Sequence, residues 1–131
     1  MIRLAHPSLI LALVASGCVA ASTGGSSPLD GTRWRFTAID GAAPVSAETS
    51  LAFTRKQLSA NVGCNGLGGE WRVEGGRLVA GPLIGTQMWC DGKMEQERAV
   101  STLLSSSPEI VRSGGKLQLR SAGHSAELIR Q

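Results

Sequence analysis

Short runs of alternating apolar and polar residues, separated by glycine-rich turns, recur along the chain and constrain its fold more than any other feature. Between Thr32 and Ile39 the alternate residues Trp34, Phe36 and Ala38 are apolar, and the residues between them are polar. A period of two is typical of a strand that buries one face. The chain has 131 residues, of which 17 are glycine, a length that suits one domain. We therefore expect a single, mainly β domain.

The same alternation predicts the remaining strands. They are expected at residues 51–53, 58–62, 70–74, 77–80, 109–112, 116–120 and 125–130. The segment 55–57 is too short to be more than a hairpin connection. Gly75-Gly76 and Gly114-Gly115 suit two-residue hairpin turns with positive φ. The strands that flank each glycine pair should therefore lie side by side.

One segment departs from this period. Residues 94–105 contain neither glycine nor proline, and Val100, Leu103 and Leu104 recur at helical spacing. We expect Asp91 to cap a helix there, with the nearby Glu95 and Glu97 on a solvated face. The predicted class is therefore α+β, mainly antiparallel: a small, strongly curved sheet or lipocalin-like barrel with one covering helix.

The N-terminal residues have the pattern of an export signal. Arg3 precedes a short apolar run at residues 8–15, which is too short to span a bilayer. The stretch from Ala15 to Cys18 resembles a bacterial lipobox, although Ala15 stands where the pattern prefers leucine. We expect a signal peptide at 1–17, a lipidated Cys18 in a flexible tether at 18–29, and a domain at 30–131. Cleavage after Ala21, which would release a soluble protein, is the alternative.

Anchorage and charge set expectations for location and partners. The residue after the lipidated cysteine is Val19, and the similarity to Gram-negative lipoproteins implies sorting to the outer membrane, facing the periplasm. The expected partners are the membrane, through the lipid, and an envelope protein or ligand whose identity the sequence does not specify. The net charge of +3 is scattered along the chain, which argues against nucleic acid as a partner. We expect a monomer.

Four segments carry a family resemblance. They are the opening at Gly31–Trp34 with Ile39–Gly41 and Pro44-Val45, the segment Gly63-Cys64-Asn65 with Gly69 and Trp71, the segment Thr86-Gln87-Met88-Trp89-Cys90, and the helical Glu97–Leu104. Over residues 31–130 the chain resembles the META domain family of HslJ-like heat-shock proteins. The resemblance implies an envelope domain, often lipid-anchored and linked to envelope stress, with no established catalytic site.

Two cysteines remain once Cys18 is assigned to the lipid. An even number of cysteines in an oxidising compartment favours a disulfide between Cys64 and Cys90; two reduced, buried thiols are the alternative. A metal site needs three or four ligands, and the exported chain offers only these thiols and His124. We therefore expect no metal and no cofactor.

The remaining polar motifs fall short of known catalytic patterns. Residues 123–127 lack the second glycine of a nucleophile elbow, and His124 is expected to be an exposed turn residue. Gly66, Gly68 and Gly69 do not form a phosphate loop and are expected at bulges or at positive φ. Asn65 is expected to close a local turn through its side chain. We therefore expect no enzyme.

The functional prediction is a non-catalytic envelope lipoprotein with a structural or binding role in envelope stress. Trp71 and Trp89 are expected mainly in the core, although one of them could line a cavity or a binding surface. Thr86 and Met88 are motif positions with a structural or binding role. The first alternative is a small-ligand carrier or protease inhibitor with a lipocalin-like cavity. The second is an enzyme whose polar groups converge only in the folded chain.

Overall fold

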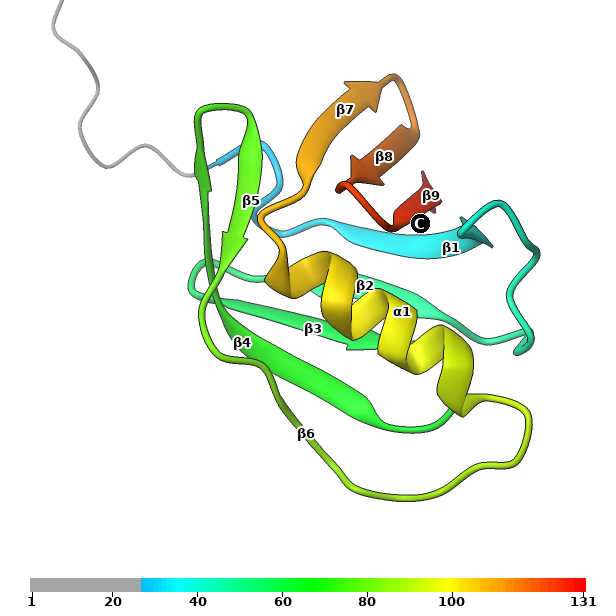
Figure 1. Ribbon diagram of the computed structural model, residues 1–131. Helices are drawn as coiled ribbons and strands as arrows, with labels where there is room; N and C mark the ends of the chain where they lie inside the picture. Colours follow the sequence, from blue (N-terminus) through cyan, green and yellow to red (C-terminus); the bar gives the residue numbers. More distant parts are fainter. Residues whose placement is uncertain (1–26) are drawn as a thin grey trace, which may run out of the picture.

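The computed structural model describes residues 27–131 (Figure 1). The predicted signal peptide, Cys18 and both candidate cleavage sites lie outside the described residues. In chain order the elements are β1 Arg33–Ile39, β2 Ser50–Phe53, β3 Gln57–Asn61, β4 Gly66–Glu74, β5 Arg77–Ala80, β6 Ile84–Gly85, α1 Met94–Ser105, β7 Glu109–Ser113, β8 Lys116–Arg120 and β9 Ser125–Arg130. The predicted helix bounds are confirmed, as are both glycine hairpins.

The sheet closes on itself. Its antiparallel order is β3-β2-β1-β9-β8-β7-β5-β4-β6, and β3 also pairs with β4, for example through Leu58 opposite Gly69. Eight strands thus form a barrel, and the two-residue strand β6 adds to the edge of β4 at Leu67 and Gly68. Of the two predicted architectures, the barrel is confirmed, because the long β4 bridges the two ends of the sheet.

Apolar side chains fill the barrel. Trp34, Leu51 and Leu117 have no exposed surface, and they belong to a single core cluster. α1 packs against β5 and β1 and adds Val100 and Leu104 to this cluster. An interior of eight strands is just wide enough for side chains to fill, and the period-two pattern supplies them.

The packed domain begins slightly before the predicted boundary. Leu29, a residue of the predicted tether, is buried in the core at 3% exposure. Its carbonyl accepts hydrogen bonds from the backbone N–H and the hydroxyl of Thr32, and that hydroxyl in turn accepts from Trp34 Nε1. The carbonyl of Pro28 accepts from Arg112. The last residues before β1 are therefore part of the fold.

Two local predictions are wrong. The residue that caps α1 is Lys93 and not Asp91, and no side chain caps the helix; the backbone N–H of Lys93 instead donates to the carbonyl of Cys90. The strand predicted from residue 70 begins at Gly66, because the glycines there pair in regular register with β3. None of Gly66, Gly68 and Gly69 has a positive φ.

Because neighbouring strands are antiparallel, each connection between strands lies at one of the two ends of the barrel (Figure 1). One end, which we name the tether end, holds the chain entry at 27–32 and the turns at 54–56, 75–76 and 114–115. The other, the loop end, holds the connections 40–49, 62–65, 86–93 and 121–124. Within residues 27–131, no helix has the length and apolar character needed to cross a bilayer.

Candidate functional site

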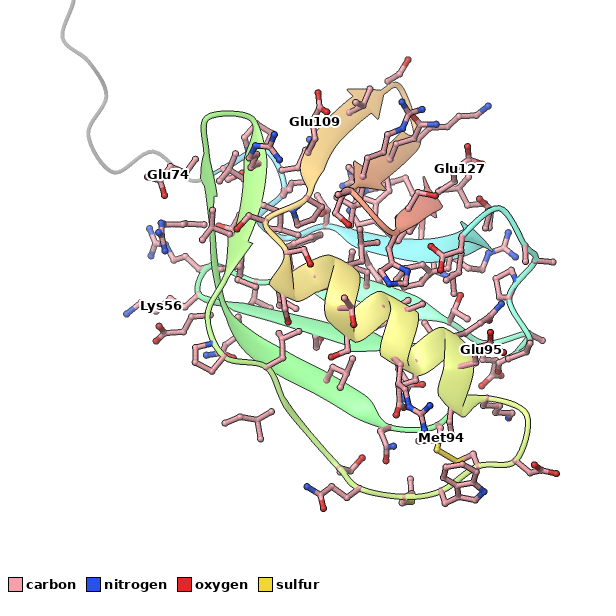
Figure 2. All side chains as sticks on the ribbon, in the orientation of Figure 1. Lys56, Glu74, Met94, Glu95, Glu109 and Glu127 are labelled. Carbon is pink, nitrogen blue, oxygen red and sulfur yellow. A yellow bond between two sulfur atoms is a disulfide. The ribbon has the colours of Figure 1, made fainter. Side chains whose placement is uncertain are left out.

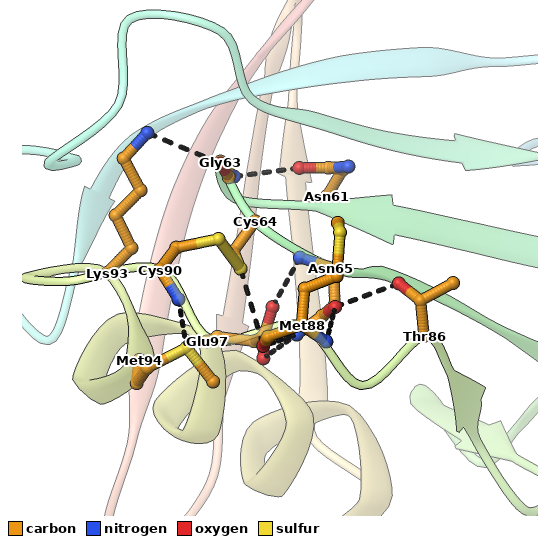
Figure 3. The surroundings of a disulfide bond; sticks show 10 residues. All are labelled: Asn61, Gly63, Cys64, Asn65, Thr86, Met88, Cys90, Lys93, Met94 and Glu97. Carbon is orange, nitrogen blue, oxygen red and sulfur yellow. Dashed lines mark hydrogen bonds between the residues drawn. A yellow bond between two sulfur atoms is a disulfide. The ribbon is translucent and has the colours of Figure 1, made fainter.

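A disulfide joins the two cysteines of the folded domain at the loop end (Figure 3). Cys64 and Cys90 are bonded, with their Cα atoms 5.9 Å apart. Cys64 follows β3, and Cys90 lies four residues before α1. The bridge therefore ties the β3–β4 connection to the long segment that leads into the helix.

The side chain of Asn65 forms hydrogen bonds with residues that are distant in sequence and so links the β3–β4 connection to the segment before α1 and to the helix itself. Its Oδ1 accepts hydrogen bonds from Thr86 Oγ1 at 2.9 Å and from the Met88 N–H at 2.8 Å. Its Nδ2 donates to the Met88 carbonyl and to Glu97 Oε2, both at 2.9 Å. An amide side chain has two donors and two acceptor positions, so all four hydrogen-bonding positions of Asn65 are used.

The prediction that Asn65 closes a local turn is wrong. Asn61 closes this turn instead, because its side-chain oxygen accepts a hydrogen bond from the Gly63 N–H.

Glu97 is buried, and the predicted solvated position on the helix is wrong. The residue is only 8% exposed. Its carboxylate accepts from the backbone N–H of Asn65 at 2.7 Å as well as from the Asn65 amide. Its place at the start of the helical motif is the signal that could have located it, because a carboxylate in the first turn of α1 points toward the loop end.

Gly63 and Gly69 allow close approaches that other residues would block. Gly63 has φ +118°, and a Cβ atom there would lie 2.5 Å from Cβ of Ser46. At Gly69, a Cβ would lie 2.9 Å from the carbonyl oxygen of Pro82. The segment after β5 can therefore run tightly along β4 toward the disulfide.

The segment that Asn65 and the disulfide hold in place presents apolar side chains outward. Ile84, Met88 and Trp89 are 79%, 56% and 72% exposed. The backbone of Met88 is fixed by Asn65, and Trp89 precedes the bridged Cys90. The expectation that Trp89 packs in the core is wrong, since its neighbours bind through their backbones and leave its side chain outside.

Trp71, unlike the exposed Trp89, packs against the barrel. It is half-buried, its ring meets Phe53 edge-on with centroids 4.9 Å apart, and its Nε1 donates to the carbonyl of Thr54. Such pairs stabilise beyond the area they bury. Trp71 therefore supports the barrel wall, as expected, and Trp89 is the displayed member of the pair.

A second polar pair joins two connections of the loop end. His124 Nδ1 lies 2.8 Å from Asp40 Oδ2, and the Ser125 N–H donates to Asp40 Oδ1 at 3.0 Å. Partial burial alone would raise the pKa of Asp40, but the hydrogen bonds from Ser125 and His124 outweigh it and hold the pKa below its ordinary 3.8. His124, expected as an exposed turn residue, is thus half-buried and paired.

Among residues 27–131, no three His, Cys, Asp or Glu side chains lie close enough to hold a metal ion. Acidic and basic residues occur at both ends of the barrel. The feature that stands out is the segment 84–90, braced by a disulfide and by Asn65.

Comparison with known proteins agrees with this architecture. The model of the META domain matches residues 27–131. A structure solved by NMR is 22% identical, with a TM-score of 0.68, and the match covers 77% of this chain and 90% of the other. An NMR structure of a protein from Burkholderia xenovorans is also 22% identical, with a TM-score of 0.64 and coverage of 98% and 99%. No curated protein matches the chain.

Proposed function

Because the chain belongs to the META domain family, we propose that it is a non-catalytic binding domain of the bacterial cell envelope. In this proposal a lipid on Cys18 anchors the domain to the outer membrane, and the segment 84–90 binds an envelope partner under stress. In this proposal the exposed segment 84–90 is the binding surface, and the barrel is the rigid support that holds it.

The exposure of Trp89 on a braced segment carries the proposal. An indole that is 72% exposed contributes little to the core, and aromatic side chains of this kind dominate the energetics of protein interfaces. Two restraints hold its backbone: the adjacent bridged Cys90 and the hydrogen bonds between Met88 and Asn65. A preorganised anchor loses little conformational entropy on binding.

The chemistry of the motif residues also supports a binding role over catalysis. The amide of Asn65 has four hydrogen-bond partners, the carboxylate of Glu97 accepts two bonds, and the thiols of Cys64 and Cys90 are joined. Groups engaged in this way support the segment. They do not offer a nucleophile or a base to a substrate.

The small-ligand carrier is the weaker candidate. A carrier requires an accessible interior, whereas here Trp34, Leu51 and Leu117 pack the barrel with no exposed surface. Of the two tryptophans considered as cavity-lining residues, Trp71 packs against Phe53 and donates a hydrogen bond to the carbonyl of Thr54, and Trp89 is 72% exposed. These contacts favour binding on the outside of the barrel.

Site-specific crosslinking in intact cells tests the binding proposal. A photoreactive amino acid replaces Trp89 in one strain and Val111, a 41% exposed residue of β7, in a matched control. We expect a discrete adduct from position 89 that becomes more abundant under envelope stress, and none from position 111. Equal adducts at both positions would contradict the proposal.

Lipid anchorage is tested separately. Palmitate labelling should be present in the wild-type chain and absent from Cys18→Ser, which should leave the membrane fraction. Labelling that persists in Cys18→Ser would exclude Cys18 as the lipidated residue.

A further inference from the structure

We propose that the tether end of the barrel docks on an anionic phospholipid surface through its basic side chains and so directs Trp89 away from the membrane. This inference extends the proposed function, because it takes the chain to be anchored at Cys18. It adds a second membrane contact and a fixed orientation.

Positive charge gathers at the tether end. The basic residues of its turns and of the adjoining strand ends are all exposed, and they are Arg33, Arg55, Lys56, Arg72, Arg77, Arg112, Lys116 and Arg130. The carboxylates of the same region are Asp30, Glu70, Glu74 and Glu109. Glu74 already pairs with Arg72, at 2.9 Å. Figure 2 shows Lys56 on the side where the chain enters the fold and Glu95 on the opposite side.

The rest of the described domain has the opposite balance. Its carboxylates are Asp40, Glu48, Asp91, Glu95, Glu97 and Glu127, and its cations are Arg35, Lys93, Arg98 and Arg120. Charges scattered along the sequence are therefore segregated by the barrel topology, which brings alternate connections to the same end. The tether end therefore has an excess of basic residues, and the rest of the described domain has a smaller excess of acidic ones.

The chain enters the fold at the basic end. Arg112 donates to the carbonyl of Pro28 at 3.0 Å, and Leu29 is buried, so the point of entry is fixed. The span from Cys18 to Ser27 covers about nine residue steps, which reach at most about 30 Å when fully extended. The anchor thus keeps this end close to the bilayer, where lysine and arginine are attracted to anionic headgroups.

Several of these cations are available for such contacts. Within residues 27–131, the side chains of Arg55, Lys56 and Lys116 form no hydrogen bond or ion pair with another residue. Arg112 and Arg130 lie over the Trp34 ring, at 5.6 and 5.7 Å, which orients their guanidinium groups. Phosphate groups at the bilayer surface would form ion pairs with these lysine and arginine side chains.

Vesicle binding by the exported chain, beginning at residue 18 and carrying Cys18→Ser, tests the inference without the lipid. This chain contains all of the residues that the structure describes, 27–131. The charge-reversal variant Lys56→Glu/Lys116→Glu alters the tether end. The matched control Arg98→Glu/Arg120→Glu changes the net charge equally but lies away from the tether end.

We expect the chain to bind phosphatidylglycerol vesicles but not phosphatidylcholine vesicles, and to dissociate as salt is raised. Lys56→Glu/Lys116→Glu should lower the partition coefficient at least about tenfold, and the control should lower it less than about twofold. Acrylamide should quench Trp89 emission equally in free and vesicle-bound protein. Thermal unfolding verifies that both variants fold.

Three outcomes would overturn the inference: equal losses in the two variants, binding to neutral vesicles, or protection of Trp89 on binding. The last result would indicate that the segment 84–90 meets the membrane. The palmitate and crosslinking experiments are independent of this result, so failure here is distinguishable from failure of the proposed function.

Discussion

The side chains of Asn65 and Glu97, 32 residues apart in sequence, meet inside the domain through a hydrogen bond of 2.9 Å, and the backbone N–H of Asn65 donates to the same carboxylate at 2.7 Å. The contact joins the β3–β4 connection to the first turn of α1. With the nearby disulfide, it fixes both sides of the segment that displays Trp89.

The first prediction concerns Asn65→Asp. The substitution replaces the donating Nδ2 with an oxygen that faces Glu97, so we expect the free energy of unfolding to fall by about 3 kcal/mol. Urea denaturation measures the change. Adding Glu97→Gln should restore part of the loss, because the new amide can donate to the carboxylate introduced at position 65. A double variant no more stable than Asn65→Asp would argue against a direct coupling.

The second prediction concerns the disulfide. Opening the Cys64–Cys90 bridge, by reduction or by Cys64→Ser/Cys90→Ser, should lower the free energy of unfolding by about 3 kcal/mol, given the 26-residue separation. Urea titrations with and without reductant provide the measurement. The double serine variant should be insensitive to reductant, and the wild-type midpoint should move toward that of the variant.

The third prediction concerns Gly63→Ala. The positive φ and the 2.5 Å approach to Ser46 should make this substitution destabilising by more than about 2 kcal/mol. Gly123→Ala is the matched control, because a Cβ atom there meets nothing within 4 Å and φ is not positive. Similar melting temperatures for the two variants would show that the close packing at Gly63 is unimportant.

The fourth prediction separates the half-buried Trp71 from the exposed Trp89. Trp89→Ala should change the free energy of unfolding by less than about 0.5 kcal/mol, because the indole is largely exposed. Trp71→Ala removes the contact with Phe53 and should cost about 2 kcal/mol or more. In acrylamide quenching, Trp89→Phe should remove most of the quenchable emission. If it does not, Trp89 is covered in solution.

The fifth prediction concerns acid stability. The pKa of Asp40 is lower in the folded chain than its ordinary 3.8, so its contribution to stability is complete above about pH 4 and is lost as the pH falls through the folded pKa. Because both partners are partly exposed, the contribution should be below about 1 kcal/mol. Asp40→Asn keeps a residue that tolerates the φ of 51°. Urea midpoints of the wild-type chain and this variant should therefore differ at about pH 6 and converge as the pH falls through the folded pKa of Asp40.

The strands and the helix were predictable because their patterns are local. Alternation around Trp34 and Phe36 marks a half-buried strand, and residues 94–105 mark the helix, whatever lies beside them. The reason for a glycine at position 69 could not be read in this way, because it is the close approach of the Pro82 carbonyl from a segment that lies beyond the next strand. β6 could not be predicted either, because a strand of two residues is too short to show an alternating pattern.

The candidate site was predictable only in part. The residues Cys64, Asn65, Met88 and Trp89 are identified by motif, but their roles depend on partners that are distant in sequence. Asn65 has the side chain of a turn former, and its actual partners lie 21 to 32 residues away. Glu97 resembles an ordinary helix carboxylate until the fold places it beneath that connection.

The amino-acid sequence alone determined the class of the domain, the family, the helix and the cysteines available for a bridge, since these depend on periodicity and residue type. The closure of the barrel, the burial of Glu97, the display of Trp89 and the separation of charge between the two ends were decided by the tertiary structure. The physical reason is that each of these depends on which distant segments the closed sheet brings together, and on which side chains are left outside once the interior is full.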